Sequence, residues 1–324
     1  MNVKSTENGK TVKRINYRKR NRSLFFAAIV ALPVLQFCIC YIYVNINSFI
    51  LAFQNYAPPI GDELGFDITF AGFDNFKEAL TLMSKRIHYL KNSLQLFFWT
   101  TIIGFTLALL FSYYIYKKYP MGGLFRVVLF IPKILSGVVF CALYKYLAGE
   151  VYVQVAQKWF GVESATTLIY NTNPDIQLGA VLFFSVWVSF GVNVLMFSGA
   201  MSGIDEAIVE SAQLDGTNAV QEFLYITVPM IWPTFVSFLV INFSGLLTDQ
   251  MHLHTFFGGN ASDKISTFGY YLYLNSTNGE LISFGSKTPV FSVQAAMGLI
   301  MTAIMLPLTL GLRKGLRKFG PSVD

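Results

Sequence analysis

The sequence predicts an all-α integral membrane protein with six transmembrane helices and with both termini in the cytoplasm. Three observations support this prediction. Of the 324 residues, 54% are hydrophobic and 13% are charged, whereas a soluble domain carries about 25% charged residues. Six apolar segments reach the roughly 20 residues that a helix needs to cross a bilayer. The basic residues gather near the two ends of the chain, as in the cytoplasmic flanks of membrane proteins.

The six apolar segments differ in how continuous they are. The third contains Pro132 and Lys133, and a proline inside a helix removes one backbone hydrogen bond. The first lies where a signal peptide would lie, but its apolar run is too long and no A-x-A cleavage site follows it, so we expect a retained span. The predicted spans cover residues 24–47, 93–117, 124–147, 178–201, 232–257 and 290–312.

Lys and Arg counts in the short flanks set the predicted orientation. The N-terminal arm, residues 1–23, carries eight basic residues, and the tail, residues 313–324, carries four. Both flank a membrane domain that covers residues 24–312, and Lys117, Lys118 and Arg126 surround the short turn after the second span. Both ends and this turn are therefore expected inside. The loops expected outside are 55–91, 149–177 and 258–289.

The loop at residues 202–231 is an exception to this rule. The number of spans before it places it in the cytoplasm, yet it carries five acidic residues and no Lys or Arg. A reversed topology would suit this loop but would put both basic termini outside. We therefore keep the topology and look for another cause of the acidic charge.

Two short helices are predicted within the acidic loop. One covers residues 204–214, with apolar residues four apart on one face, and Gly216 suits the reversal of the chain that follows. The second covers residues 217–227, and Pro229 and Pro233 then stop or kink the chain.

Glu206 and Glu210 lie four residues apart on one face of the first predicted helix. Like charges at this spacing destabilise an isolated helix by a few tenths of a kcal/mol. The repulsion is understandable if a basic partner meets the two carboxylates. The alternative is an ordinary helical hairpin in contact with water.

The stretch EAIVESAQLDGTNAVQEFLYITVPMIWP resembles the cytoplasmic EAA loop of binding-protein-dependent ABC importer permeases. The family pattern has E-A-A, then D-G-A, then Phe, Ile, Leu-Pro and a further Pro. Ser211, Thr217 and Asp205 depart from it, the last from a proline that is usual in sugar permeases. The matching positions here are Glu210-Ser211-Ala212, Asp215-Gly216-Thr217, Phe223, Ile226, Val228-Pro229 and Pro233.

The similarity continues over nearly the whole chain after residue 24 and points to the carbohydrate-uptake subfamily, whose members include maltose and multiple-sugar permeases. Thr248, His252 and His254 depart from the subfamily pattern in the last of the similar segments. The segments that carry the resemblance are SFILAFQNY (48–56), FAGFDNFKEAL (70–80), FRVVLFIPKILSGVVFCALYKYL (125–147), WVSFGVN (187–193) and TDQMHLHTFFGG (248–259).

This resemblance implies the type I ABC importer transmembrane fold and a multi-pass location in the bacterial plasma membrane. The implied function is a permease subunit that takes up an oligosaccharide or related sugar by alternating access, driven through the coupling helices of residues 204–228. The implied partners are a second homologous permease, which makes a heterodimer, two cytoplasmic ATPases, an extracellular solute-binding protein, the sugar and membrane lipid, but no nucleic acid. The implied ATPase-coupling residues are Glu206, Glu210, Ser211, Ala212, Asp215, Gly216, Phe223 and Pro229.

No G-x-x-x-x-G-K-[ST] phosphate loop occurs in the sequence, so we expect no enzymatic activity in this chain. ATP and Mg²⁺ would be used by the partner ATPases, and we expect no cofactor here. Cys38, Cys40 and Cys141 lie in apolar runs without the spacing of a metal site or a disulfide framework.

Polar residues inside the spans are candidates for the substrate path. Asp249 lies within the fifth predicted span, and an acid at membrane depth usually faces a cavity or a partner. It lines the path or pairs with a neighbouring helix. Lys133 reaches the interface or lines the path, and the aromatic and amide candidates either contact sugar or pack in the core. The candidate path residues are Trp187, Asn193, Asn242, Asp249, Gln250 and His252.

A stand-alone secondary transporter or channel for a small polar solute is the alternative function, and it would not need the acidic loop. A membrane-embedded enzyme is a further alternative, but no catalytic constellation such as H-E-x-x-H occurs. The sequence does not indicate which sugar is carried.

Overall fold

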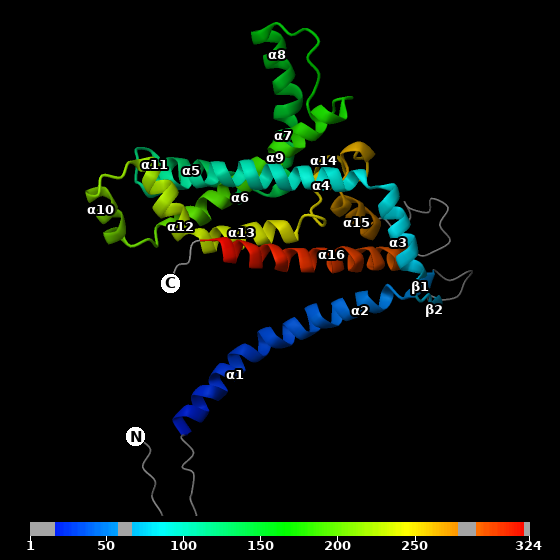
Figure 1. Ribbon diagram of the computed structural model, residues 1–324. Helices are drawn as coiled ribbons and strands as arrows, with labels where there is room; N and C mark the ends of the chain where they lie inside the picture. Colours follow the sequence, from blue (N-terminus) through cyan, green and yellow to red (C-terminus); the bar gives the residue numbers. More distant parts are fainter. Residues whose placement is uncertain (1–16, 58–66, 278–289, 321–324) are drawn as a thin grey trace, which may run out of the picture.

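The computed structural model describes residues 17–57, 67–277 and 290–320, whose regular secondary structure is helical apart from one short pair of strands (Figure 1). Within these ranges, five helices are long and apolar enough to cross a membrane. A sixth span results if the bent pair Ala219–Met230 and Trp232–Ser244 is counted as one. The predicted all-α membrane architecture is confirmed, whereas the number of spans depends on this bent pair.

The N-terminal span stands apart from the other helices. It consists of α1 (Tyr17–Phe37), a π-helical segment (Cys38–Tyr43) and α2 (Val44–Leu51). Its apolar stretch, Phe25–Leu51, is not buried against the rest of the described chain, and only α2 approaches the bundle, near α16 (Figure 1). The segment predicted at 24–47 is therefore a helix, which extends further at both ends, from Tyr17 to Leu51.

A small cap lies at the end of the bundle where α2 ends. Strand β1 (Gln54–Ala57) pairs antiparallel with β2 (Asp67–Phe70). Helix α3 (Asp74–Lys85) follows and contacts α16 (Val290–Phe319). The side chain of Asn75 donates hydrogen bonds to the carbonyls of Ala52 and Gln54, both at 3.0 Å, and so fixes α3 to the end of the first span.

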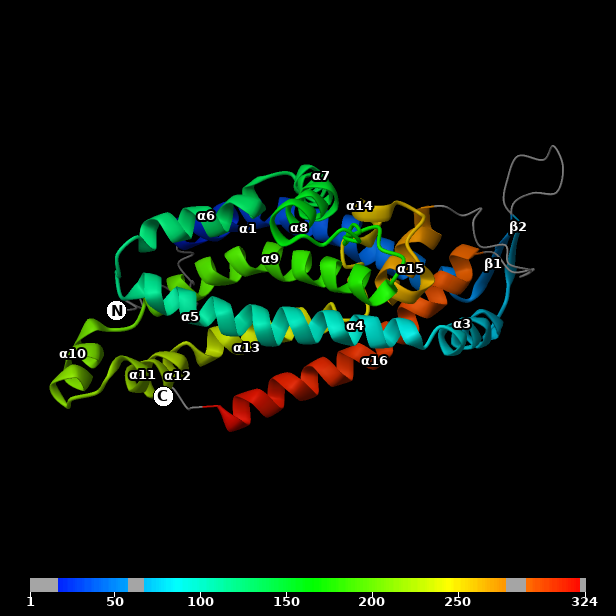
Figure 2. The ribbon, with the colours of Figure 1, turned by 90° about the horizontal axis from the view of Figure 1, so that it is seen from above.

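The centre of the bundle is formed by the second span and α9 (Pro174–Met201), which lie side by side (Figure 2). The second span consists of α4 (His88–Phe98), a π-helical turn (Trp99–Ile103) and α5 (Gly104–Tyr116). Helix α6 (Gly122–Ile134) packs on α9 where Gly191 faces its backbone: a Cβ on Gly191 would lie 1.9 Å from the carbonyl oxygen of Leu129. The close contact between the two helices therefore requires glycine at this position.

The third predicted span, residues 124–147 with an interruption at Pro132 and Lys133, is divided into two helices that do not form one span. Helix α6 ends at Ile134, the next two residues are extended, and α7 (Gly137–Tyr146) starts in a new direction. A π-helical turn (Leu147–Val151) joins α7 to α8 (Tyr152–Phe160), and the two helices leave the bundle at a steep angle (Figures 1 and 2). The break follows Pro132, whose ring removes a helical hydrogen bond, and the membrane-length helix is Gly137–Phe160 instead.

The prediction of a fifth span at residues 232–257 is also wrong as a single helix. Helix α13 (Trp232–Ser244) ends early, and an irregular segment, residues 245–252, leads to the short α14 (Leu253–Phe257). A 3₁₀ turn (Asp263–Ile265) and α15 (Phe268–Thr277) complete this region.

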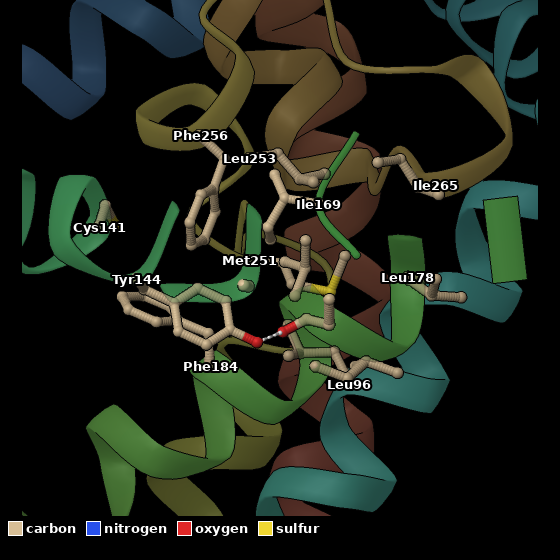
Figure 3. Packing of buried hydrophobic residues seen from close by; sticks show 14 of the residues in the cluster. Leu96, Cys141, Tyr144, Ile169, Leu178, Phe184, Met251, Leu253, Phe256 and Ile265 are labelled. Atoms are coloured by element: carbon tan, nitrogen blue, oxygen red, sulfur yellow. Dashed lines mark hydrogen bonds between the residues drawn. The ribbon is translucent and has the colours of Figure 1, made fainter. Parts of the chain in front are cut away.

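A buried cluster joins α7, α9 and the irregular region. Figure 3 shows the rings of Tyr144, Phe184 and Phe256 packed together, with centroids of successive rings 5.0 Å and 4.8 Å apart. The hydroxyl of Tyr144 donates a hydrogen bond to the carbonyl of Ala180 at 2.8 Å. The cluster therefore fixes the C-terminal part of α7 to α9.

The acidic loop lies at the end of the bundle opposite the strands (Figure 1). It contains α10 (Glu206–Leu214), α11 (Ala219–Glu222), a π-helical turn (Phe223–Thr227) and α12 (Val228–Met230). The predicted kink at the two prolines is observed: the helical axes before and after Ile231 differ by 68°.

Candidate functional site

The first half of the acidic loop is a capped helix that projects from the bundle. Asp205 has extended backbone angles, and its carboxylate accepts a hydrogen bond from the amide of Ala207 at 3.1 Å. Asp205 is thus the N-cap of α10, and the helix begins at Glu206 rather than at residue 204 as predicted. The helix ends at Leu214, and the chain then turns at Gly216, whose φ of +81° lies in the region that favours glycine.

The exposed surface of α10 combines acidic and apolar side chains. Glu206, Glu210 and Ser211 are exposed, whereas Val209 and Ala212 are buried. Of the apolar stripe predicted on one face of this helix, Ala212 is buried and Ile204 is partly buried, whereas Ile208 is exposed. Exposed large apolar side chains also occur over both halves of the loop: Ile208, Leu214, Val220, Leu224 and Tyr225. Apolar residues gathered beside acids on an exposed surface are typical of a protein-docking site.

The second half of the loop is tied to the second span. Asn218 and Gln221 form a capping box that starts α11, with reciprocal hydrogen bonds of 2.9 Å and 3.0 Å. Glu222 is 2% exposed. Its two carboxylate oxygens lie 2.6 Å and 2.7 Å from the amino group of Lys117, at the end of α5.

Aromatic contacts surround this ion pair. The hydroxyl of Tyr113 donates to the carbonyl of Ala219 at 3.0 Å. The rings of Tyr113 and Phe223 lie 5.0 Å apart, and the amino group of Lys117 lies 5.9 Å from the ring of Tyr113. Phe223, which was predicted as a coupling residue, therefore belongs to the contact with α5.

The roles of Lys117 and Glu222 were not predicted from the sequence. Lys117 was counted only as a base that sets the orientation, and Glu222 only as one acid of the loop. The two residues are 105 positions apart. The charge pattern did indicate a separate role for Glu222, because Glu222 is the one acid of the loop that lies in the second predicted helix.

Three candidate path residues of the fifth predicted span, Asp249, Gln250 and His252, lie in the irregular segment 245–252. The carboxylate of Asp249 accepts a hydrogen bond from the amide of Met251 at 2.8 Å, and its carbonyl accepts one from the hydroxyl of Thr267 at 2.9 Å. Met251 and His252 have φ values of +52° and +55°, which non-glycine residues seldom adopt. Asp249 is exposed and Gln250 is partly exposed.

Gly269 allows α15 to pack closely against the backbone of the irregular segment. A Cβ on Gly269 would lie 2.3 Å from the carbonyl oxygen of Thr248 and 2.5 Å from the carbonyl carbon of Asp249. Backbone therefore packs directly on backbone here, and a larger residue would displace the break.

The other candidate path residues do not form one site with Asp249. Trp187 lines a cavity of about 670 Å³ between α7, α8 and α9, which is mostly apolar and also includes Tyr152 and Phe183. Asn193 is buried within α9, and the amide of Asn242 donates to the carbonyl of Phe238 in its own helix.

His252 connects these two regions only through packing. Its ring lies 5.4 Å from the ring of Phe184, in the cluster against which Trp187 also packs. Within the described ranges, no group of three His, Cys, Asp or Glu residues could hold a metal ion.

Three kinds of similarity to known proteins complete the description of the site. The model of the family described as "Binding-protein-dependent transport system inner membrane component" matches residues 100–314. The arabinooligosaccharides transport system permease protein AraP of Bacillus subtilis is 24% identical over 281 residues, which cover 86% of this chain and 83% of AraP. AraP of Halalkalibacterium halodurans is 25% identical, with 92% of each chain covered.

Two solved structures share the fold. The crystal structure of a bacterial ABC transporter involved in the import of the acidic polysaccharide alginate contains a chain that matches with a TM-score of 0.73 and 20% identity, over 94% of this chain and 98% of that one. A second alginate transporter structure, in complex with a periplasmic protein bound to an alginate pentasaccharide, matches with a TM-score of 0.70 and 20% identity, over 92% and 95%.

Proposed function

Because the chain belongs to the family of binding-protein-dependent transport system inner membrane components, we propose that it is the permease subunit of an ATP-driven importer for a carbohydrate. It is a multi-pass protein of the bacterial membrane. The observation that carries the proposal is the acidic loop, which offers the exposed acids of α10 beside apolar side chains. This surface suits a basic groove on a cytoplasmic ATPase, and a channel or a stand-alone transporter has no use for it.

In the proposed topology, six spans cross the membrane and both termini lie in the cytoplasm with the acidic loop. The position of α16 supports this arrangement, because the indole of Trp232 donates a hydrogen bond to the carbonyl of Leu316 at 3.1 Å. The basic end of α16 therefore lies next to the start of α13, on the side of the acidic loop (Figure 1).

The proposed roles of the loop residues follow from their positions. Glu206, Glu210, Ser211 and Asp215 are exposed and would contact the ATPase. The other predicted coupling residues support that surface: Ala212 packs on the inner face of α10, Gly216 permits the turn, and Phe223 and Pro229 lie in the half that follows. ATP and Mg²⁺ would act on two ATPase subunits, while this chain would hold no cofactor.

The carbohydrate class is proposed from the relatives, among which AraP is named for arabinooligosaccharide transport. A second permease would pair with this chain, and an extracellular binding protein would deliver the sugar. Specificity among sugars would then rest with both the binding protein and the path.

The irregular segment 245–252 is the best candidate for the path wall in this chain. Non-helical backbone at membrane depth is tolerated where protein covers it or where it lines a water-filled cavity. Asp249 and Gln250 would face the second permease across the path, with His252 behind them. Trp187, Asn193 and Asn242 lie outside this segment, so we give them no part in the first contact with sugar.

Asp249→Asn tests this assignment because it keeps the side-chain acceptor for Met251 but removes the charge. We expect the KM for sugar uptake to rise about tenfold, a change of about 1.4 kcal/mol, while basal ATP hydrolysis stays unchanged. Asp175→Asn, in the first turn of α9, is the control. Equal uptake kinetics in the two variants would remove Asp249 from the path.

The function itself is tested in proteoliposomes that contain this chain, a second permease and the partner ATPases. Labelled neutral pentose and hexose oligosaccharides, preloaded on the binding protein, should accumulate only when ATP and every subunit are present. Uptake that persists without the ATPase subunits would instead indicate a stand-alone transporter or channel.

A further inference from the structure

The ion pair between Lys117 and Glu222 is unusual because both side chains are taken out of water. The side chain alone is 17% exposed in Lys117 and 3% exposed in Glu222. Two other ion pairs of the described chain, Lys77–Asp74 and His88–Asp263, are largely exposed. A buried charge is tolerated only when it is paired, and removal of one partner leaves the other uncompensated.

The pair joins elements that the chain itself connects only distantly. Lys117 caps the C-terminal end of α5, and Glu222 ends α11 in the acidic loop. The hydrogen bond from Tyr113 to the carbonyl of Ala219 gives a second attachment on the same two elements. The rings of Tyr113 and Phe223 close the contact on its apolar side.

The capping box at Asn218 stiffens the part of the loop that this contact holds. Its reciprocal hydrogen bonds fix the start of α11, so that Glu222 is presented to Lys117 within one rigid turn. The preceding helix, α10, is joined to α11 by the turn at Gly216. Movement of α10 can therefore reach α5 through α11, across the Lys117–Glu222 contact.

We infer that the Lys117–Glu222 pair is the contact that transmits movement of the acidic loop to the second span during transport. The inference rests on the proposed function, and it assigns to Lys117 and Glu222 a positioning role rather than a contact with ATPase or sugar. An apolar pair of similar volume would hold the two elements together equally well. A charged pair, in contrast, is favourable only when the amino group and the carboxylate lie opposite each other. It therefore resists sliding of α11 along α5.

The test uses the complete importer in proteoliposomes, with binding protein and ATP. Lys117→Met and Glu222→Gln each remove one charge at nearly constant volume, and the double variant Lys117→Glu with Glu222→Lys reverses the pair. The control is Lys118→Met, which removes the neighbouring, exposed charge. Sugar transported per ATP hydrolysed is measured at equal amounts of assembled complex.

We expect both single variants to assemble with the ATPases and to hydrolyse ATP, but to transport at least about tenfold less sugar per ATP. The charge-reversed double variant should recover a large part of that loss, and Lys118→Met should match the wild type. Normal coupling in both single variants would overturn the inference. Loss of assembly in both, without recovery in the double variant, would show a purely structural role and would overturn it as well.

A distance measurement provides a readout that does not depend on transport. Spin labels are placed at Tyr119, just after α5, and at Val220 in α11. Both positions are exposed, and they lie on the two elements that the Lys117–Glu222 pair connects. The distance between them should stay constant with and without ATP in the wild type and should change with ATP in Lys117→Met. A constant distance in the variant would contradict the inference.

Absence of ATP-dependent uptake by the wild-type complex would instead contradict the proposed function, and this inference with it.

Discussion

The two halves of the acidic loop carry the same kind of charge and yet relate to the bundle in opposite ways. On α10, Glu206 and Glu210 are exposed to solvent, whereas on α11 Glu222 is buried against Lys117. The first half is free to meet a partner, and the second half is attached to the second span. An acidic side chain of the loop is therefore available to a partner protein only when no basic side chain of the same chain pairs with it. The net charge of the loop does not show which acids are free and which are paired.

The largest effect is expected from a change that separates the two halves. Gly216→Pro cannot adopt the φ of +81° that the turn requires, because the proline ring holds φ near −65°. We expect transport to fall at least about tenfold while the chain still inserts and copurifies with the second permease.

Gly216→Ala is the matched control for that variant. Alanine in the left-handed region costs about 1–2 kcal/mol, so we expect reduced but measurable transport. Uptake by Gly216→Pro within twofold of the wild type would show that the two halves need not be connected by this turn.

A smaller effect is expected from reversing one exposed charge on α10. Glu210→Lys would place a base against the proposed basic groove, and we expect roughly tenfold weaker association with the ATPase, or about 1.4 kcal/mol. The affinity of the wild type should fall as salt is added, because exposed charges are screened. Binding of the detergent-solubilised permease pair to the isolated ATPase measures both quantities.

Glu163→Lys makes the same charge change in the loop between α8 and α9, where Glu163 is exposed. It should leave the affinity for the ATPase unchanged. If the two variants behave alike, the acids of α10 have no specific partner, and the first half of the loop would be an ordinary solvated helix.

The smallest effect is expected from the capping box at the start of α11. Asn218→Ala removes one side of the capping box, which should destabilise the start of α11 by about 1 kcal/mol. We expect thermal unfolding of the purified complex at a temperature lower by about 2 °C, with transport per ATP retained. Gln213→Ala, an exposed change in α10, should leave the unfolding temperature unaltered. A loss of coupling in Asn218→Ala alone would mean that the cap takes part in the motion.

Several features were correctly predicted from the sequence because they depend on local composition. The apolar segments near residues 24–47, 93–117, 178–201 and 290–312 are all helices of membrane length. The two short helices of the acidic loop and the kink before the fifth span follow from capping residues, glycine and proline, which act over a few positions. Membership of the family was likewise visible in the spacing of residues 206–233 and was confirmed by the family match.

The failures concern places where contacts distant in the sequence decide the conformation. Apolar composition predicted one helix at residues 232–257, but Gly269 lets the backbone of α15 press against Thr248, and the helix gives way to residues 245–252. In the same way, α7 turns away from α6 and is fixed on α9 by Tyr144. Hydropathy measures whether a segment prefers lipid, and it contains no information about which segments pack together.

The sequence by itself determined that this protein is a helical membrane protein, where its acidic loop lies and to which family it belongs, because hydropathy, caps and motif spacing are properties of neighbouring residues. Only the tertiary structure decided which acid of the loop is free and which is bound. Lys117 and Glu222 lie 105 positions apart, and their charges meet only after α5 and the acidic loop have packed. The interaction of two charges depends on their distance and on the exclusion of water, and both are set by the fold.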